Sequence, residues 1–175
     1  MQDFDFKRCT RKCDTTDREI EPGERYFSAI IDDGEEVIRK DFAEDQWSTP
    51  PEGCIGWWQS RVPVLEKGKI YWAPNPVLLA YFDALMSKPD QSNYAYVMAL
   101  LLIRKRILQW KDSMVRAEVE FMLVRNPKTK ETLEVQVTNI SPAQIQAIQD
   151  ELAEQLFTDV IEEPDQEDEH DEDNG

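Results

Sequence analysis

The chain has 175 residues, 41% of them hydrophobic, which is enough for one domain with a packed core and without a disulfide framework. Its formal net charge is −16, and ten of its carboxylates lie in residues 159–173, a segment without Lys or Arg, so that residues 1–158 carry only about −6. An anionic body with an anionic tail repels a phosphate backbone, which disfavours general nucleic-acid binding.

The cysteine count and the N-terminal sequence favour a cytoplasmic protein. Three cysteines leave one thiol unpaired in any disulfide scheme, so the reduced thiols of a cytosol fit better. The first nine residues, MQDFDFKRC, lack the apolar segment of a secretory signal. The most apolar run, residues 95–103, is far shorter than the roughly 20 residues that span a bilayer. We therefore expect no membrane segment.

The first 72 residues predict a β-rich lobe, because Gly and Pro residues punctuate short segments that are rich in aromatic and β-branched side chains. Asp33-Gly34 favours a type I′ turn, whose two central residues both need a positive φ angle, and so predicts a hairpin. Residues 42–56 contain consecutive prolines and two glycines, which disfavours regular structure there. The expected strands are residues 26–31, 36–40, 57–62 and 69–72.

Residues 73–157 predict a second, α+β lobe. The segment from residue 91 or 92 to about Trp110 is apolar on nearly every face over its first half, so we expect it to be the central, buried helix. Ser141-Pro142 supplies an N-cap and a first-turn proline for the last helix. The other expected elements are helices over residues 75–87 and 142–157, and strands over residues 114–124 and 132–138, which form a hairpin across residues 126–128.

From Thr158 onward the chain predicts a disordered acidic tail, because no apolar residue recurs after Ile161. No internal repeat or flexible linker separates the two lobes, which should therefore share contacts. The expected fold class is α+β: an N-terminal β-rich, zinc-ribbon-like lobe (1–72), a helical lobe that carries a β-hairpin (73–157), and the tail (158–175).

The candidate metal ligands are Cys9 and Cys13, which form a Cys-x3-Cys pair, and the distant Cys54. Two thiolates four residues apart can point to one centre when the chain turns between them. Zinc takes four ligands, and the only histidine, His170, lies in the tail, so Asp14, another carboxylate or water would complete the site. One alternative is a thiol-redox pair, because the neighbouring Lys and Arg residues stabilise the thiolate form. The other is that the cysteines are ordinary packed thiols. Zinc is therefore the one candidate cofactor.

The sequence contains no complete catalytic motif. Without a histidine in the structured part, the usual Ser-His and Cys-His pairs are missing, and the six glycines form no phosphate-binding loop. These gaps favour a protein that is not an enzyme. The alternative is a thiol- or metal-dependent sensor or enzyme centred on Cys9, Cys13 and Cys54.

The candidate binding residues are Trp47, Trp57 and Trp58, which fall in the irregular part of the first lobe, together with Arg61, which could stack on an indole ring. Such residues form peptide-binding or stacking platforms, or else they belong to the core. We expect a binding or adaptor protein that recognises a protein partner through this lobe, while the tail adds solubility or regulates access. Binding of RNA or DNA through the basic residues 7–12 is a third interpretation.

Three segments resemble a family of uncharacterised bacterial proteins, planctomycete ones especially. They are C-x2-T-x-R-x-I-x-P-G-E-x-Y-x-S at residues 13–28, WW at residues 57–58 and ALLLIRKR at residues 99–106. The family also carries the N-terminal Cys-x3-Cys pair. The resemblance implies a bacterial cytosolic protein, and it implies no functional residue because the family has no assigned activity.

Overall fold

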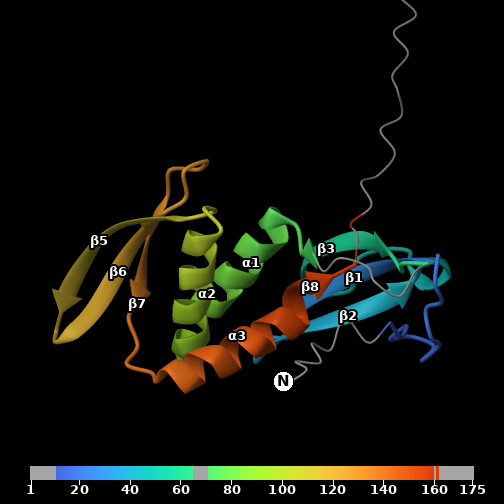
Figure 1. Cartoon of the computed structure of the whole chain (residues 1–175), viewed down its shortest axis with the longest axis horizontal. Coiled ribbons are helices and arrows are strands. Elements are labelled where there is room, and N and C mark those ends of the chain that lie inside the picture. The colour runs from blue at the N-terminus through green and yellow to red at the C-terminus, as the bar shows by residue number, and fades with distance from the viewer. Residues whose placement is uncertain (1–10, 65–70, 160, 162–175) are drawn as a thin grey trace, which may run out of the picture.

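The computed structural model describes residues 11–64, 71–159 and 161 (Figure 1). Within these residues the chain forms three α-helices and eight strands, and the strands are arranged in three sheets. This mixed architecture confirms the predicted α+β class. None of the described helices is both long enough and apolar enough to cross a membrane.

The first sheet is antiparallel, with its first strand in the middle. Its strands are β1 (Arg25–Asp32), β2 (Val37–Ala43) and β3 (Cys54–Arg61), and each overlaps a predicted strand. The turn at Asp33-Gly34 is longer than predicted, because the loop between the paired strands contains four residues. The Asp33 carboxylate accepts hydrogen bonds from the backbone N–H groups of Glu35 and Glu36, and only Gly34 in this loop has a positive φ angle, 97°. These interactions replace the two-residue type I′ turn.

Two helices follow, α1 (Asn75–Met86) and α2 (Ser92–Arg104). The bounds of α1 agree with the prediction to within one residue, with Pro76 in its first turn. The predicted extension of α2 to Trp110 is wrong, because the helix ends at Arg104 and Arg106 has a positive φ angle of 62°. Leu108, which continues the helical pattern in the sequence, lies after the helix and is buried there. The apolar character of Leu108 therefore did not distinguish a longer helix from the turn that follows the helix.

A second three-stranded sheet follows α2 in the order β5-β6-β7. Its strands are β5 (Gln109–Arg116), β6 (Val119–Arg125) and β7 (Thr132–Gln136). The antiparallel pairing of β6 with β7 confirms the predicted second hairpin. Residues 114–124, predicted as one strand, instead turn back at Ala117-Glu118 into a hairpin of β5 and β6. Both turn residues have positive φ angles, 50° and 67°, although neither is Gly, Asn or Asp.

Replacement of the β5–β6 turn by Asn-Gly should stabilise the protein. Ala117 and Glu118 occupy the left-handed region, which is strained for most residues with a Cβ atom. Gly has no Cβ atom, and the short polar side chain of Asn can hydrogen-bond to the local backbone, so both adopt this region more readily. We expect Ala117→Asn/Glu118→Gly to raise the free energy of unfolding by about 1 kcal/mol, measured by urea denaturation. Lys128→Gly is the control, because Lys128 has no positive φ angle and a glycine there should only destabilise. Unchanged or reduced stability of the double variant would contradict the turn geometry.

The last helix, α3 (Pro142–Leu156), returns the chain to the first sheet (Figure 1). It begins as predicted, with a capping box in which Ser141 Oγ accepts a hydrogen bond from the Gln144 N–H and the Gln144 side chain accepts one from the Ser141 N–H. The helix leads directly into β8 (Phe157–Thr158), which pairs with β4 (Tyr71–Trp72). Strand β8 lies where the sequence predicted the end of a helix and the start of a disordered tail.

The predicted boundary of the disordered tail at Thr158 is placed too early. Thr158 and Asp159 are buried, and Ile161 forms a β-bridge with Ser60 of β3. The prediction failed because Thr158 and Asp159 are polar, and polar residues are usually exposed. Here their side chains are buried and form hydrogen bonds. The remainder of the predicted tail, residues 162–175, lies outside the described residues.

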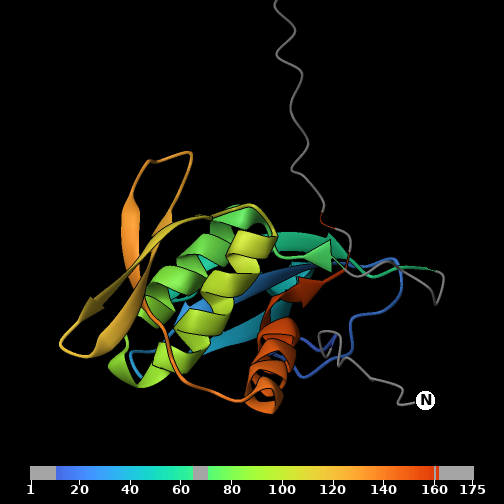
Figure 2. The same ribbon diagram turned by 60° about the vertical axis from the view of Figure 1, so that its left-hand side comes forward.

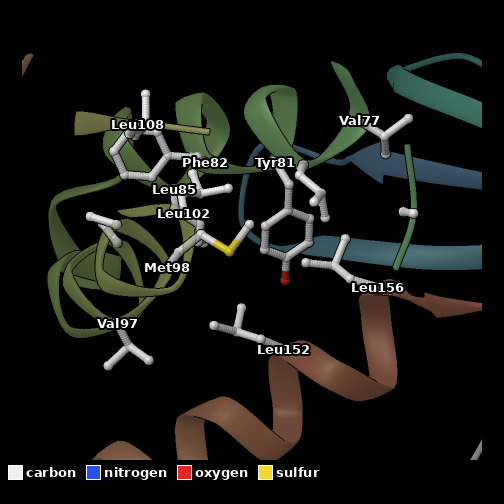
Figure 3. Close-up of a cluster of buried hydrophobic side chains, with 14 of the residues drawn as sticks. Val77, Tyr81, Phe82, Leu85, Val97, Met98, Leu102, Leu108, Leu152 and Leu156 are labelled. Atoms are coloured by element: carbon white, nitrogen blue, oxygen red, sulfur yellow. The ribbon is translucent and has the colours of Figure 1, made fainter. Parts of the chain in front are cut away.

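One hydrophobic core joins the two predicted lobes. Helices α1 and α2 lie between the first sheet and the β5-β6-β7 sheet (Figures 1 and 2). Leu152 and Leu156 of α3 close this core from one side (Figure 3), and Ile30 and Trp58 enter it from the first sheet. The boundary predicted after residue 72 therefore does not divide the core. A second, smaller cluster contains Cys13, Ile20, Tyr26, Ala43 and Val62.

Candidate functional site

Four aromatic rings lie in contact on one face of the first sheet. Phe27 comes from β1, Phe42 from β2, Trp57 from β3, and Trp47 from the loop between β2 and β3. Phe27 and Trp47 stack with their ring centroids 4.7 Å apart and their planes 2° from parallel, and Trp57 lies 5.6 Å from Trp47. The grouping follows from the strand register, because Phe27 and Phe42 are cross-strand partners and alternate residues of a strand share a face. We call these four rings the aromatic face.

Trp57 is the most exposed ring of the aromatic face. Forty-seven per cent of its surface is exposed, whereas Phe27, Phe42 and Trp47 are half-buried. Phe27 and Trp47 contact the indole ring, at 5.8 and 5.6 Å between ring centroids, so coverage of this ring would order few additional side chains. Large aromatic side chains of this kind dominate the energy of many protein interfaces.

An apolar hollow lies beside Trp57, at the junction of β3 and α1. It has a volume of about 410 Å³, and its walls include Pro50, Pro76 and Val77. The close approach of the helix to the strand depends on Gly56, since a Cβ atom at this position would lie only 3.1 Å from a methyl group of Val77. The aromatic face and the hollow therefore form one continuous apolar surface on either side of Trp57.

The edge of this surface is acidic. Glu44, Asp45 and Glu52 are exposed in the loop that carries Trp47, and residues 42–60 contain no Lys or Arg. Asp45 pairs with Arg18 at 3.4 Å, which offsets part of this charge. The negative potential of this loop adds to that of a chain with a net charge of −16. The loop that carries Trp47 is therefore net acidic.

Trp58 and Arg61, the other two predicted binding residues, make different contacts. Trp58 points to the opposite face of the sheet and is only 3% exposed. Its indole N–H donates a hydrogen bond to Thr158 Oγ1 at 2.9 Å, so it belongs to the core rather than to the surface of Trp57. Arg61 lies at the end of β3, where its guanidinium donates a hydrogen bond to the carbonyl of Gly23 at 2.9 Å. The structure brings Trp47 and Trp57 together and places Trp58 apart from them.

A buried polar network occupies the inner face of the first sheet. Arg39 Nε donates to Asp41 Oδ1 at 3.1 Å, both side chains are only 5% exposed, and Ser28 Oγ donates to the same carboxylate at 2.6 Å. The Arg39 guanidinium also lies 5.0 Å from the ring centre of Trp58 and donates to the backbone carbonyl of Phe157. The complementary charges and hydrogen bonds allow these polar groups to be buried.

Residues 157–159 complete this network from the C-terminal side. Thr158 Oγ1 lies 2.9 Å from Ser60 Oγ, within hydrogen-bonding distance. The Asp159 carboxylate accepts a hydrogen bond from the Tyr26 hydroxyl at 2.8 Å and pairs with Arg11 at 3.0 Å. Asp159 is thus joined to Arg11, which is the first of the described residues.

The structure separates Cys13 from Cys54. Cys13 lies in the small cluster with Tyr26, whereas Cys54 pairs with Ile31 at the other end of β1. Five residues of β1 separate these two positions, which corresponds to about 17 Å along a strand. Cys9 lies outside the described residues. Among the residues that the structure describes, no group of three or more His, Cys, Asp or Glu side chains could hold a metal ion.

The environments of the two described thiols differ. Burial, the largest influence on the Cys13 thiol, raises its pKa, but hydrogen bonds from the backbone of Ala43 and from Thr16 outweigh burial and leave the pKa below its ordinary value. Burial raises the pKa of the Cys54 thiol, which donates a hydrogen bond to the Gly56 carbonyl at 3.3 Å. Cys13 is therefore the more readily ionised of the two.

No protein-family model matches the chain, and neither curated proteins nor solved structures show a significant match to it. The resemblance to uncharacterised planctomycete proteins stays a prediction. Function is therefore inferred from the chemistry of the aromatic face and its surroundings.

Phe27 and Phe42 were not among the predicted members of the candidate site. A signal was available for Phe27, which lies in the predicted strand 26–31, whereas Phe42 belongs to residues 42–56, where irregular structure was expected. The observed β2 extends to Ala43, and its pairing with β1 places both rings on one face. The contribution of Trp47 could not be inferred, since its position depends on an irregular loop.

Proposed function

We propose that the protein is a non-catalytic binding protein of the cytoplasm that recognises a partner protein through the aromatic face. The observation that carries the proposal is Trp57, an indole ring that its neighbours hold in place while nearly half of its surface stays exposed. Coverage of this ring by a partner would bury apolar area at a low cost in side-chain entropy.

The surroundings of Trp57 define the chemistry of the partner. The adjacent hollow is lined by proline and valine and suits an apolar or proline side chain. The acidic residues Glu44, Asp45 and Glu52 favour Lys or Arg on the segments that flank it. The proposed ligand is therefore an extended segment of a protein, with an apolar or proline residue between basic residues.

A peptide-display library selected against the full chain, followed by titration of the selected peptides, tests this proposal. We expect the selected peptides to combine basic residues with proline or large apolar residues. Trp57→Ala should weaken their binding at least about 30-fold, which corresponds to about 2 kcal/mol. Trp110→Ala is the matched control, because Trp110 is 54% exposed on β5, in the other sheet, and its removal should leave binding unchanged.

Two outcomes would contradict the proposal. One is a library that yields no peptide whose affinity depends on Trp57, and the other is an equal loss of affinity in the Trp57 and Trp110 variants. Because Trp57 is exposed, its replacement should leave the fold intact, which the far-UV circular dichroism spectrum of the variant would establish.

A thiol- or zinc-dependent role is the second candidate, supported by the lowered pKa of the Cys13 thiol. With Cys54 at the far end of β1, a metal bound by Cys9 and Cys13 would need its other ligands from elsewhere in the chain or from water. The prediction that the first lobe resembles a zinc ribbon depends on this second candidate function.

A further inference from the structure

A second cavity lies on a different part of the molecule, between β2, α1 and α3. It has a volume of about 370 Å³, and its apolar walls include Val37, Leu85 and Leu152. Cavities of a few hundred cubic ångströms, with apolar walls and a few polar groups, are typical of small-molecule sites. This cavity shares no residue with the hollow beside Trp57 and is independent of the proposed protein-binding function.

Tyr81 and Gln155 each contribute a polar side chain to the lining of this cavity. Tyr81 is only 4% exposed, and its hydroxyl points from α1 toward α3, between Leu152 and Leu156 (Figure 3). The side-chain oxygen of Gln155, on α3, is buried without a hydrogen-bond partner among the described residues. Burial of an unpaired polar group costs free energy, so this oxygen would gain from a ligand that donates a hydrogen bond, and the Tyr81 hydroxyl offers a second acceptor in the lining.

The charged groups at the cavity favour a cation. Glu36, Glu151 and Glu154 contribute three carboxylates to its lining. The single lysine in the lining, Lys88, has its ammonium group 2.8 and 3.0 Å from the two carboxylate oxygens of Asp32, which offsets its charge. The lining is therefore net acidic.

The protonation state of Tyr81 agrees with this electrostatic preference. Burial raises the pKa of the Tyr81 hydroxyl above its ordinary value, and the charges of Tyr94 and Glu151 raise it further. The hydroxyl therefore stays neutral at physiological pH, and its oxygen can accept a hydrogen bond. The Tyr94 hydroxyl donates to the Glu151 carboxylate, which positions that carboxylate at the cavity.

We propose that this cavity binds a primary alkylammonium group, as carried by diamines and polyamines. An ammonium group has three N–H donors. They match three acceptors in the lining, namely the Tyr81 hydroxyl oxygen, the Gln155 side-chain oxygen and a carboxylate oxygen of Glu151. The alkyl chain would lie against the apolar walls, and the charge would meet the three carboxylates.

Calorimetric titration of the full chain with 1,5-diaminopentane tests the proposal, with 1-pentanol as the uncharged comparison. We expect the diamine to bind and pentanol not to bind. An arm with Nα-acetyl-lysine amide distinguishes a free amine from a lysine side chain of another protein, since both carry the same ammonium group. Tighter binding of the diamine supports a metabolite, and tighter binding of the lysine derivative supports the same chemistry from a protein. Absence of binding by both amines overturns the proposal.

Tyr81→Phe separates the cavity from general attraction of amines to an acidic chain. It removes one hydroxyl oxygen and keeps the ring, so we expect an affinity about tenfold lower, as for the loss of one hydrogen bond to a charged group. Tyr71→Phe, on β4, is the matched control and should bind as the unchanged protein does. A chain that ends at residue 161 should also retain binding. Equal affinity of the Tyr81 and Tyr71 variants would show attraction by the acidic chain alone and overturn the proposal.

Glu151→Gln provides a second, independent variant. Glu151 is exposed, so its replacement should preserve the fold even if Tyr81→Phe perturbs the core. We expect the affinity for the diamine to be about three- to tenfold weaker, which corresponds to the loss of one partly screened ion pair. Binding should also depend less on salt concentration. Unaltered affinity and salt dependence would contradict the assignment of Glu151 to the site.

Discussion

A chain that ends at Leu156 should have a free energy of unfolding at least about 4 kcal/mol lower than that of the full-length protein. For a chain that ends at Ile161, the free energy of unfolding should differ from the full-length value by less than about 0.5 kcal/mol. The difference isolates residues 157–161 from the acidic residues 162–175. The latter contain no Val, Leu, Ile, Met, Phe, Tyr or Trp, and their removal reduces the negative charge of the chain.

The large effect follows from the contacts of residues 157–159. The Phe157 ring packs edge-on against Trp72 at 4.4 Å, and Thr158 Oγ1 accepts the indole N–H of Trp58. The Asp159 carboxylate accepts a hydrogen bond from the Tyr26 hydroxyl. The chain that ends at Leu156 therefore loses several buried polar contacts at once. Each buried group left without its partner costs about 1–3 kcal/mol.

Urea denaturation of the two shortened chains measures this difference, with the full-length protein as the reference. Equal midpoints and slopes for all three proteins would show that residues 157–161 contribute nothing to the fold. Loss of stability in the chain that ends at Ile161 would instead assign structure to the acidic residues beyond it.

The elements that the sequence predicted well are those that local chemistry determines. Pro76 lies in the first turn of α1, Ser141 caps α3, and a hairpin loop at Asp33-Gly34 joins β1 to β2, although this loop is longer than predicted. Their side chains act on their own backbone or on that of close neighbours. No knowledge of the rest of the fold is needed to place them.

The missed elements depend on distant contacts. The Ala117-Glu118 turn lacks turn-forming residues and is imposed by the pairing of β5 with β6. Thr158 and Asp159 look like the beginning of a polar tail, yet their partners, Trp58 and Tyr26, lie about 100 residues or more away in sequence. Hydrophobic patterns predict burial through apolar contacts and do not detect burial through such hydrogen bonds.

The candidate sites show the same division. Trp47 and Trp57 were predicted from composition alone, whereas the opposite orientation of Trp58 follows from strand alternation, which places neighbouring residues on opposite faces. The cavity at Tyr81 lies between α1 and α3. In the sequence, Tyr81 looks like an ordinary tyrosine of the core. Only the tertiary packing places this side chain in the lining of a cavity.

Replacement of Arg39 should be the most damaging single substitution in the polar network. Arg39→Met keeps much of the side-chain volume but removes the charge that faces the buried Asp41 carboxylate at 3.1 Å. Removal of one partner from a buried ion pair leaves an uncompensated charge and costs about 3–5 kcal/mol. Lys40→Met is the control on the same strand, because the Lys40 ammonium group lies 3.6 Å from Asp14 in a more exposed pair that should contribute less than about 1 kcal/mol.

The double variant Arg39→Met/Asp41→Asn separates the stranded charge from the other contacts of Arg39. Asparagine carries no charge and can still accept the hydrogen bond from Ser28, so it relieves the penalty that Arg39→Met creates. We expect the double variant to recover about 1–2 kcal/mol relative to Arg39→Met, measured by urea denaturation. A double variant no more stable than the single one would mean that the contacts of Arg39 with Trp58 and the Phe157 carbonyl, rather than the ion pair, hold residues 157–159 on the sheet.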